Sequence, residues 1–247
     1  MQLLIACAKT MATPPPPTPP GHAPAFLDYA AKIAADMAQY TPEQLQQILR
    51  VNHTIATENY RRYKHWGDPD TLRPAVMSYD GIVFQRLDAR SLSPDTLRYA
   101  DAHLFIGSFL YGLLRPLDLI NPYRLEGDVT LPVTGFKTLF DYWKPILTDY
   151  LIDTIKSDDG ILVNLASAEF KRLFDWRRVT KEVTVLTPEF RVAKDGREKM
   201  VTVYAKICRG AMTRYILETR PTTPEDLTRF TYEGFLHTDT LRFVLPQ

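Results

Sequence analysis

The chain has 247 residues, of which 45% are hydrophobic and 24% are charged, and 30 Lys and Arg against 29 Asp and Glu leave a net charge of +1. These are the proportions of an ordinary globular protein, so a disordered, fibrous or coiled-coil chain is excluded. The balanced charge does not by itself indicate a nucleic-acid or membrane partner, so such a partner would have to bind a local patch. Cys7 and Cys208 form no CxxC or zinc-ligand pattern, which fits a reducing cytoplasm and no disulfide framework.

The first element that we expect is a buried strand over residues 2–8, because this apolar run lacks the preceding basic segment of a secretory signal. Residues 13–24, TPPPPTPPGHAP, hold seven prolines and predict an extended, exposed loop before the first helix. A PxxP-type ligand for a partner domain is the alternative interpretation of this loop. The longest uncharged apolar stretch, residues 104–114, is well short of the roughly 20 residues that a spanning helix needs, so we expect no membrane partner.

Helices and strands are expected to alternate along the rest of the chain. Capping side chains followed by proline and an acid, as in Thr41-Pro42-Glu43, mark helix starts. Apolar periodicity predicts helices over 25–38, 42–50, 53–65, 94–103, 136–156, 167–174, 205–219 and 224–229, with a kink at Pro145. Runs of β-branched and aromatic residues predict strands over 2–8, 75–86, 103–109, 161–166, 181–192, 199–204 and 235–244. Asp195-Gly196 lies between two such runs and predicts a tight hairpin turn.

We therefore expect one α/β domain over residues 1–247, of mixed α+β type, in which helices flank a mixed and partly antiparallel sheet. The patterns GxGxxG, GxxxxGK, GxSxG and HExxH are missing from the sequence. Hydride transfer on a Rossmann site, P-loop phosphoryl transfer and zincin hydrolysis are accordingly not expected. Convergent sites without a motif remain open.

Charge is unevenly distributed along the chain. Residues 171–220 contain 13 basic and six acidic side chains, a local net charge of +7. The helix expected over 205–219 places Lys206, Arg209, Thr213 and Arg220 on one face, opposite an apolar face, with Gly210 beside them allowing a close backbone approach. This is either a solvated face or a face that presents cations to an anionic partner.

A second group of charges lies among apolar and proline residues, in Leu113-Leu114-Arg115-Pro116-Leu117-Asp118 and in Pro122-Tyr123-Arg124-Leu125-Glu126. Charges in such surroundings must be paired if they are buried. Arg115 with Asp118 and Arg124 with Glu126 either satisfy one another or line a cleft that binds phosphate or carboxylate.

Polar residues also follow two of the expected strands. Asn164, Ser167 and Glu169 follow the strand over 161–166 at its carboxyl end, where open α/β sheets bind ligands. Lys9 holds the same position after the first strand, as an anion ligand, a nucleophile or a solvated turn residue.

Five blocks of the sequence are similar to those of one family. They are Ile5-Ala6-Cys7-Ala8-Lys9-Thr10, Leu110-Tyr111-Gly112-Leu113-Leu114-Arg115-Pro116-Leu117-Asp118-Leu119, Pro122-Tyr123-Arg124-Leu125-Glu126, Val163-Asn164-Leu165-Ala166-Ser167-Ala168-Glu169, and Tyr204-Ala205-Lys206 with Arg209-Gly210. From its first strand to about Leu245 the chain resembles the YaaA family of bacterial peroxide stress proteins. Two departures are Ala6-Cys7, where the family usually has Ser-Pro, and the proline run at 14–20.

The resemblance implies a cytoplasmic protein that protects DNA and protein during hydrogen peroxide stress by lowering unincorporated iron. It also implies a family-specific fold that binds double-stranded DNA through a positive cleft and a helix-hairpin-helix-like element. For that element we expect residues 43–64, with Arg61, Arg62 and Lys64 on the second helix.

The leading hypothesis is a monomeric, non-enzymatic stress protein that binds the phosphates of double-stranded DNA with little sequence preference. The candidate DNA or anion ligands are Lys9, Arg61, Arg62, Arg115, Arg124, Lys206, Arg209 and Arg214. The candidate cleft-lining residues are Thr10, Asp118, Tyr123, Glu126, Asn164, Ser167 and Glu169.

The alternative is an enzyme that acts on a small anionic or nucleotide-like substrate in the same cleft. Lys9 or Glu126 would be its reactive group, and Asn164 and Ser167 would orient the substrate. A dedicated iron site is disfavoured, because the five histidines are dispersed, so we expect no metal and no cofactor and interpret the iron effect as indirect.

Overall fold

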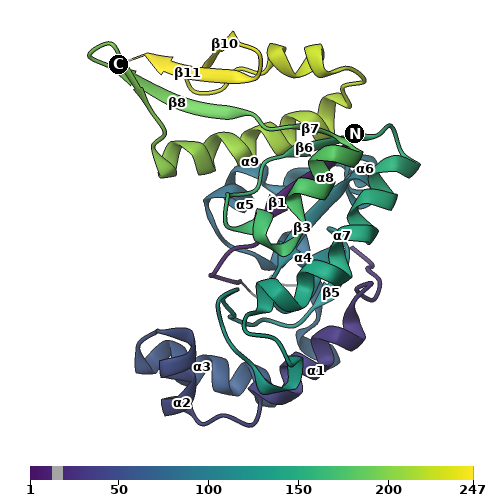
Figure 1. Cartoon of the computed structure of the whole chain (residues 1–247), viewed down its shortest axis with the longest axis vertical. Helices are drawn as coiled ribbons and strands as arrows, with labels where there is room; N and C mark the ends of the chain where they lie inside the picture. Colours follow the sequence, from purple (N-terminus) through teal and green to yellow (C-terminus); the bar gives the residue numbers. More distant parts are fainter. Residues whose placement is uncertain (13–18, 247) are drawn as a thin grey trace.

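The structure is a computed structural model that describes residues 1–12 and 19–246. Part of the expected proline-rich loop, residues 13–18, lies outside the described residues. The molecule is a crescent, with the helices α2 (Pro42–Leu49) and α3 (His53–Lys64) at one end and a small sheet with the C-terminus at the other (Figure 1). In the described part of the chain, no helix is long and apolar enough to cross a membrane.

A mixed sheet lies in the middle of the crescent. It contains β1 (Gln2–Ala6), β3 (Leu104–Ser108), β4 (Gly112–Leu114), β6 (Ile161–Asn164) and β7 (Thr184–Leu186) in the order β4-β3-β1-β6-β7. The β3-β1-β6-β7 part is parallel, and β4 pairs antiparallel with β3. The chain runs from β1 to β3 on one side and later to β6 on the other side. The strand order therefore reverses between β1 and β6, which is where open α/β sheets form a crevice.

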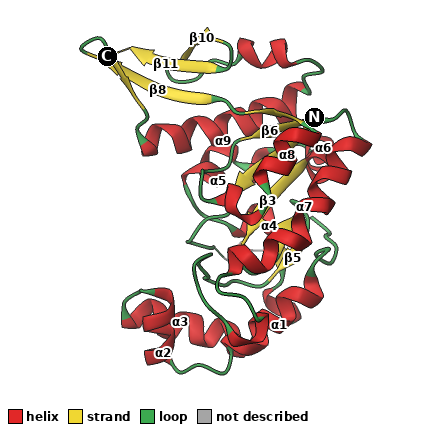
Figure 2. Ribbon diagram, in the orientation of Figure 1, coloured by secondary structure: helices red, strands yellow, loops and turns green. Residues whose placement is uncertain are grey.

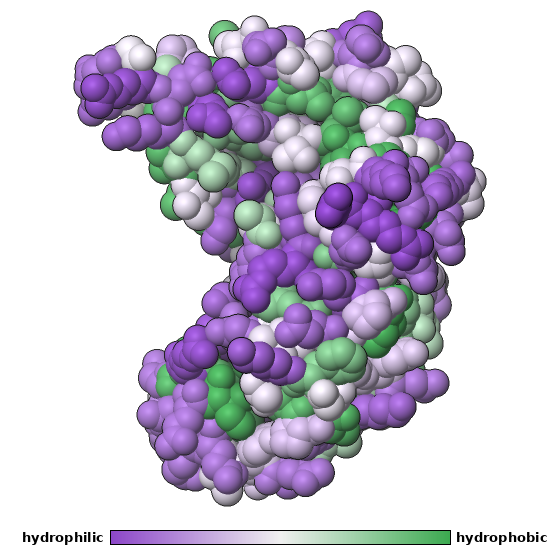
Figure 3. Space-filling model, viewed as in Figure 1, coloured by the Kyte–Doolittle hydropathy of each residue, from purple (hydrophilic) through white to green (hydrophobic). Residues whose placement is uncertain are grey.

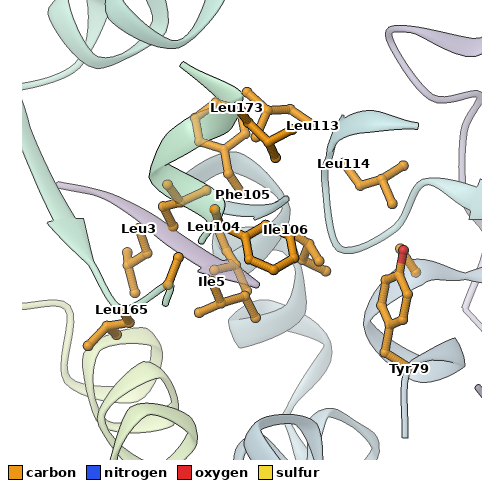
Figure 4. Close-up of a cluster of buried hydrophobic side chains, with 14 of the residues drawn as sticks. Leu3, Ile5, Tyr79, Leu104, Phe105, Ile106, Leu113, Leu114, Leu165 and Leu173 are labelled. Atoms are coloured by element: carbon orange, nitrogen blue, oxygen red, sulfur yellow. The ribbon is translucent and has the colours of Figure 1, made fainter. Parts of the chain in front are cut away.

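Apolar strand residues form the centre of the core. Leu3 and Ile5 of β1 are fully buried beside Leu104 and Ile106 of β3, with which they are in register (Figure 4). Both faces of these strands are apolar, as expected for a parallel sheet covered on both sides. Helices surround the sheet (Figure 2), and α7 (Leu139–Ser157), which contains Pro145, buries Trp143. The sequence prediction of an α/β fold with a mixed, partly antiparallel sheet is confirmed.

The second sheet has the order β10-β11-β8-β9 and packs on α9 (Thr202–Thr219). Its strands are β8 (Glu189–Lys194), β9 (Arg197–Lys199), β10 (Leu236–Asp239) and β11 (Arg242–Pro246). Asp195 and Gly196 have φ values of 52° and 71°, and Lys194 pairs with Arg197, so the predicted hairpin turn is confirmed.

The helical end of the crescent combines α1 (Leu27–Met37) with the pair α2 and α3. Thr41 forms a capping box with Gln44 at the start of α2, and the Asn52 side chain accepts from the Ile55 N–H at the start of α3. The turn between the two helices passes through Arg50 in the left-handed region, with φ of 51°. The two helices predicted over 42–50 and 53–65 are therefore present and pack against each other.

The remaining elements are short. They are β2 (Arg73–Pro74), β5 (Leu119–Ile120), α6 (Pro94–His103), α8 (Trp176–Glu182) and the 3-10 turns Pro69–Thr71, Ala89–Ser91, Pro132–Thr134, Phe170–Leu173 and Pro224–Arg229. The expected helix over 167–174 is thus only a 3-10 turn. The expected strand over 181–192 is interrupted at Thr187-Pro188, since proline has no N–H for a ladder bond.

Two strand predictions were wrong. Residues 75–86 form α4 (Ala75–Ser78) and α5 (Ile82–Leu87). Helix α5 packs on α9, and α4 contacts the short strands β2 and β5 without joining a sheet. Residues 199–204 contain the end of β9 and the start of α9, where Val201 and Val203 are exposed. Tertiary packing overrides strand propensity at residues 75–86, whereas residues 202–204 form the exposed first turn of α9, whose later turns are buried.

Candidate anion-binding site

A cavity of about 390 Å³ lies at the carboxyl ends of β1 and β6, at the point where the strand order reverses. The segment after β1 reaches the concave edge of the crescent (Figure 1), which is hollowed between the two ends of the molecule (Figure 3). The cavity collects polar residues from four separate parts of the sequence: Lys9, Thr10, Tyr123, Arg124, Ser167, Glu169, Lys206 and Arg209. All eight are among the candidate anion-binding or cleft-lining residues predicted from the sequence.

Two cations line the cavity from α9. Lys206 is exposed and Arg209 is half-buried, and burial lowers the pKa of the Arg209 guanidinium. Neither side chain has an acidic partner among the described residues. Other side chains of α9, among them Cys208, Met212 and Ile216, are buried and anchor the helix in the core. A half-buried guanidinium without a counter-charge is costly, so an anion that binds here would stabilise the folded protein.

The α9 face differs from the expected one at two positions. Thr213 was expected on the cationic face, but it is fully buried and its hydroxyl donates to the Arg209 carbonyl. Gly210 does allow a close approach, but the approaching backbone is that of α5: a Cβ at Gly210 would lie 2.2 Å from the Val83 carbonyl oxygen. The glycine therefore serves helix packing.

Lys9 and Arg124 of the lining form an ion cluster with Glu126, which was expected to line the cavity but is not among its lining residues. The Glu126 carboxylate is 2.8 Å from Lys9 Nζ through one oxygen and 3.3 Å from Arg124 Nη2 through the other. Glu126 and Arg124 are mostly buried, whereas the Lys9 side chain is 63% exposed. The buried Nε–H of Arg124 has no hydrogen-bond partner within the described residues. One carboxylate thus neutralises only one of two cations, and the cluster retains a positive charge.

Hydroxyl groups and one further carboxylate complete the lining. The Ser167 hydroxyl and the Glu169 carboxylate, which follow β6, form no hydrogen bond or ion pair with the part of the chain that the structure describes. Thr10 donates to the Asp80 carbonyl. The Tyr123 hydroxyl bonds to Tyr79 at 2.8 Å and to Ser108 at 2.6 Å, so it is already occupied. Ser167 and Glu169 are therefore the groups available to a ligand.

The apolar part of the lining was not foreseen from the sequence. Phe109 and Phe170 stack on each other with centroids 4.7 Å apart, and Phe84 packs on Tyr79. Phe84 belongs to α5, which the sequence suggested to be a strand, so its place could not be inferred. The one signal in that region was Gly81, which also lines the cavity.

A protein-family model described as "Peroxide stress protein YaaA" matches residues 1–241. The chain belongs to this family. It is 52% identical over 237 residues to a UPF0246 protein of Bacteroides fragilis, which covers 95% of this chain and 92% of the relative. UPF0246 proteins of Porphyromonas gingivalis and Burkholderia thailandensis are 40% and 37% identical over 242 residues, covering 96% and 95% of this chain and 94% and 92% of the relatives. The resemblance read from the sequence blocks is confirmed, and the family name supports a role in peroxide stress.

Arg115 and Asp118, two of the predicted site residues, do not line the cavity of this YaaA-family chain. The Arg115 guanidinium lies over the Phe105 ring and donates to Gln2 and to the Leu104 carbonyl, so the considered Arg115–Asp118 side-chain pair is wrong. The Asp118 carboxylate instead accepts from the Arg115 backbone N–H at 2.7 Å and contacts His22 at 2.9 Å. Both residues are part of the sheet edge.

The other nominated residues are also outside the cavity. Asn164 lies in a smaller neighbouring cavity, where its side chain accepts from the Ala166 N–H. Arg61 and Arg62 are in the last turn of α3, with Arg62 paired to Glu58. Arg214 binds the carbonyls of Leu87 and Asp88 and so ties α9 to the end of α5.

The structure shows no candidate metal site in the described ranges 1–12 and 19–246. Within them, no group of three or more His, Cys, Asp and Glu side chains is close enough to hold a metal ion. The chemistry of the cavity is that of cations, hydroxyls and aromatic rings.

Proposed function

We propose that this YaaA-family protein acts in peroxide stress by binding double-stranded DNA through phosphate contacts on its concave side. The observation that carries the proposal is the pair Lys206 and Arg209, two neighbouring cations that face the cavity and have no acidic partner in the described part of the chain. DNA phosphates are natural counter-charges for such a pair, and phosphate contacts carry no sequence information.

The rest of the basic surface supports the same proposal. The β8–β9 hairpin carries exposed Lys194, Arg197 and Lys199 at one end of the crescent. The α2–α3 pair, with Arg61 at the end of α3, forms the other end (Figure 1). A duplex along the concave side would be contacted from both ends and from Lys206 and Lys9 between them.

We propose in addition that the protein limits unincorporated iron indirectly, in the cytoplasm and as a monomer. The lining of the cavity supports the indirect effect on iron, because its charged groups are mainly cations, which repel iron ions. Metal analysis of untagged protein after dialysis against ferrous iron should then find far less than one iron per chain. One tightly held iron per chain would contradict the indirect action.

A DNA titration with matched variants tests the binding proposal. Lys206→Ala with Arg209→Ala should weaken binding of unrelated duplexes at least tenfold and reduce the slope of log affinity against log salt by about 2. The control is Arg177→Ala with Lys181→Ala, which removes two exposed cations from α8 and should leave affinity within about threefold. For the parent, a rise from 50 to 200 mM salt should weaken binding by an order of magnitude or more. Binding that ignores salt, or a double variant that binds as the parent does, would overturn the proposal.

A further inference from the structure

The cavity has the position and size of a small-molecule site. It lies at the carboxyl ends of β1 and β6, where the strand order reverses, and open α/β sheets bind ligands at such points. Its volume of about 390 Å³ is within the range of roughly 300 to 1,000 Å³ for ligand pockets. A duplex can lie across the opening, but it is too wide to enter. The interior is therefore available to a second ligand.

The two cations of the cavity lining favour a doubly charged anion as ligand. Lys206 and Arg209 both line the cavity, and neither is neutralised within the described residues. A phosphate monoester carries between one and two negative charges at neutral pH and offers three acceptor oxygens. Guanidinium binds such an oxygen pair in a fork, and an ammonium adds a point charge. A phosphate monoester matches both cations, whereas a carboxylate would leave one of them without a counter-charge.

The apolar part of the lining favours a ligand with a flat, apolar ring system. Phe84, Phe109 and Phe170 line the cavity and are almost fully buried, and the stacking of Phe170 on Phe109 fixes both rings. Rigid aromatic walls favour planar rings, which gain stacking and area burial with little loss of side-chain entropy. The ligand is therefore a phosphate joined to an aromatic ring system.

Two further hydrogen-bonding groups line the cavity. Ser167 and Glu169 follow β6 and have no hydrogen-bond partners among the residues the structure describes. A carboxylate at the end of a sheet strand is a common acceptor for ribose hydroxyls, and a serine hydroxyl both donates and accepts. A sugar that links the ring to the phosphate would satisfy both.

We infer that the cavity binds a free nucleoside monophosphate, with its phosphate at Lys206 and Arg209, its ribose at Ser167 and Glu169, and its base against Phe109 and Phe170. This site goes beyond the proposed DNA binding. It shares Lys206 and Arg209 with the proposed DNA surface, so a duplex and a monophosphate should compete for these two cations. It gives the cavity at the β1–β6 crevice a ligand of its own, which a duplex on the concave side would cover.

Calorimetric titration of the full chain with three probes tests this site. Adenosine 5′-monophosphate should bind saturably, and adenosine and inorganic phosphate should each bind at least tenfold more weakly, because each supplies only half of the contacts. Lys206→Ala with Arg209→Ala should weaken the monophosphate at least tenfold and leave adenosine within twofold. A monophosphate that binds no better than inorganic phosphate, or a double variant that keeps its affinity, overturns the inference.

A variant that fills the cavity separates this site from the DNA surface. Ile82 lines the cavity from α5 and is half-buried, so Ile82→Trp should occlude the interior, whereas Ile82→Val should keep monophosphate binding within twofold. Ile82→Trp should lose at least tenfold in monophosphate affinity and keep duplex affinity within threefold. If Ile82→Trp fails to fold, separate titrations of the parent protein with duplex and with monophosphate decide the outcome. Salt-dependent DNA binding without monophosphate binding would overturn this inference alone, and the reverse result would overturn only the proposed DNA function.

Discussion

The guanidinium of Arg115 lies over the ring of Phe105, with its central carbon 3.7 Å from the ring centroid. The same group donates to Gln2 Oε1 at 3.1 Å and to the Leu104 carbonyl at 3.4 Å. Arg115 therefore joins β1 and β3 at the end of the sheet opposite the cavity. Its charge is favoured by this aromatic face, by the two neutral oxygens, by Tyr150 and by the nearby carboxylates of Asp101 and Asp118.

Arg115→Ala should destabilise the protein without changing its ligand affinity. The variant loses a cation–π contact and two charge-assisted hydrogen bonds, so the free energy of unfolding should fall by about 2 to 3 kcal/mol. Arg115→Lys keeps the charge but not the planar fork and should lose less. Urea denaturation measures the first effect, and DNA titration of the folded variant should give the parent's affinity. A parent-like stability, or weakened DNA binding, would show that Arg115 acts elsewhere.

Lys206 and Arg209 should behave in the opposite way. They have no acidic partner in the described part of the chain, and burial disfavours the charge of Arg209. Replacing both by alanine should therefore change the free energy of unfolding by well under about 1 kcal/mol. Thermal melts without ligand would measure this change. A loss of several kcal/mol would mean that the pair supports the fold, and its effect on binding could no longer be read as a contact.

The His22–Asp118 contact predicts how stability depends on pH. Burial raises the pKa of the Asp118 carboxyl to about 6, and the hydrogen bond with Asp101 raises the pKa of His22. A group with a raised folded pKa stabilises the protein below its unfolded pKa and loses that contribution as pH rises through the folded value. For Asp118 this window runs from about 4 to about 6, and for His22 it begins near 6.5.

Stability should thus fall as pH rises from 5 to 8. Asp118→Asn removes the carboxyl contribution but can still accept from the Arg115 N–H, so its stability should fall less over this range, by roughly 1 to 2 kcal/mol. Urea denaturation at several pH values would compare the two proteins. Equal slopes, or a parent that becomes more stable as pH rises, would contradict the assignment.

Some of the site could be predicted from the sequence and some could not, for physical reasons. Lys9, Ser167 and Glu169 directly follow strands, and parallel strands bring their carboxyl ends to one edge, so local sequence was sufficient. Lys206 and Arg209 followed from helical periodicity. For these residues, the position of the side chain is decided by residues that are close in the sequence.

Arg115 and the α5 segment show the limit of the same reasoning. Arg115 was expected to pair with Asp118, but its partner Phe105 and acceptor Gln2 come from strands that are adjacent only after folding. Residues 82–87 have strand propensity, yet contact with α9 makes them a helix. Contacts between segments that are distant in the sequence decide both cases, and such contacts cannot be predicted from the pattern of a single sequence.

The cysteines should be poor targets for peroxide. Burial raises the pKa of the Cys7 thiol and that of Cys208 to about 12 each, and the thiolate is the reactive form. At pH 7.5 both should therefore react with hydrogen peroxide or iodoacetamide at least about a hundredfold more slowly than in urea-unfolded protein. Mass spectrometry of timed reactions measures this. Rapid formation of one sulfenic acid per folded chain would instead indicate direct sensing through a cysteine.

Gly210→Ala tests whether the crossing of α5 and α9 sets the geometry of the cavity. In an exposed helix this change stabilises by about 1 kcal/mol, because glycine is the poorer helix former. Here the new Cβ would meet the Val83 carbonyl oxygen at 2.2 Å and the Arg86 Cβ at 2.8 Å, so the two helices must separate. We expect a net loss of roughly 2 to 3 kcal/mol in urea denaturation. Because Val83 lines the cavity from α5 and Arg209 lines it from α9, separation should also weaken ligand binding in the folded fraction. A variant as stable as the parent would mean that the contact between α5 and α9 can accommodate the added Cβ, and that the cavity does not depend on this glycine.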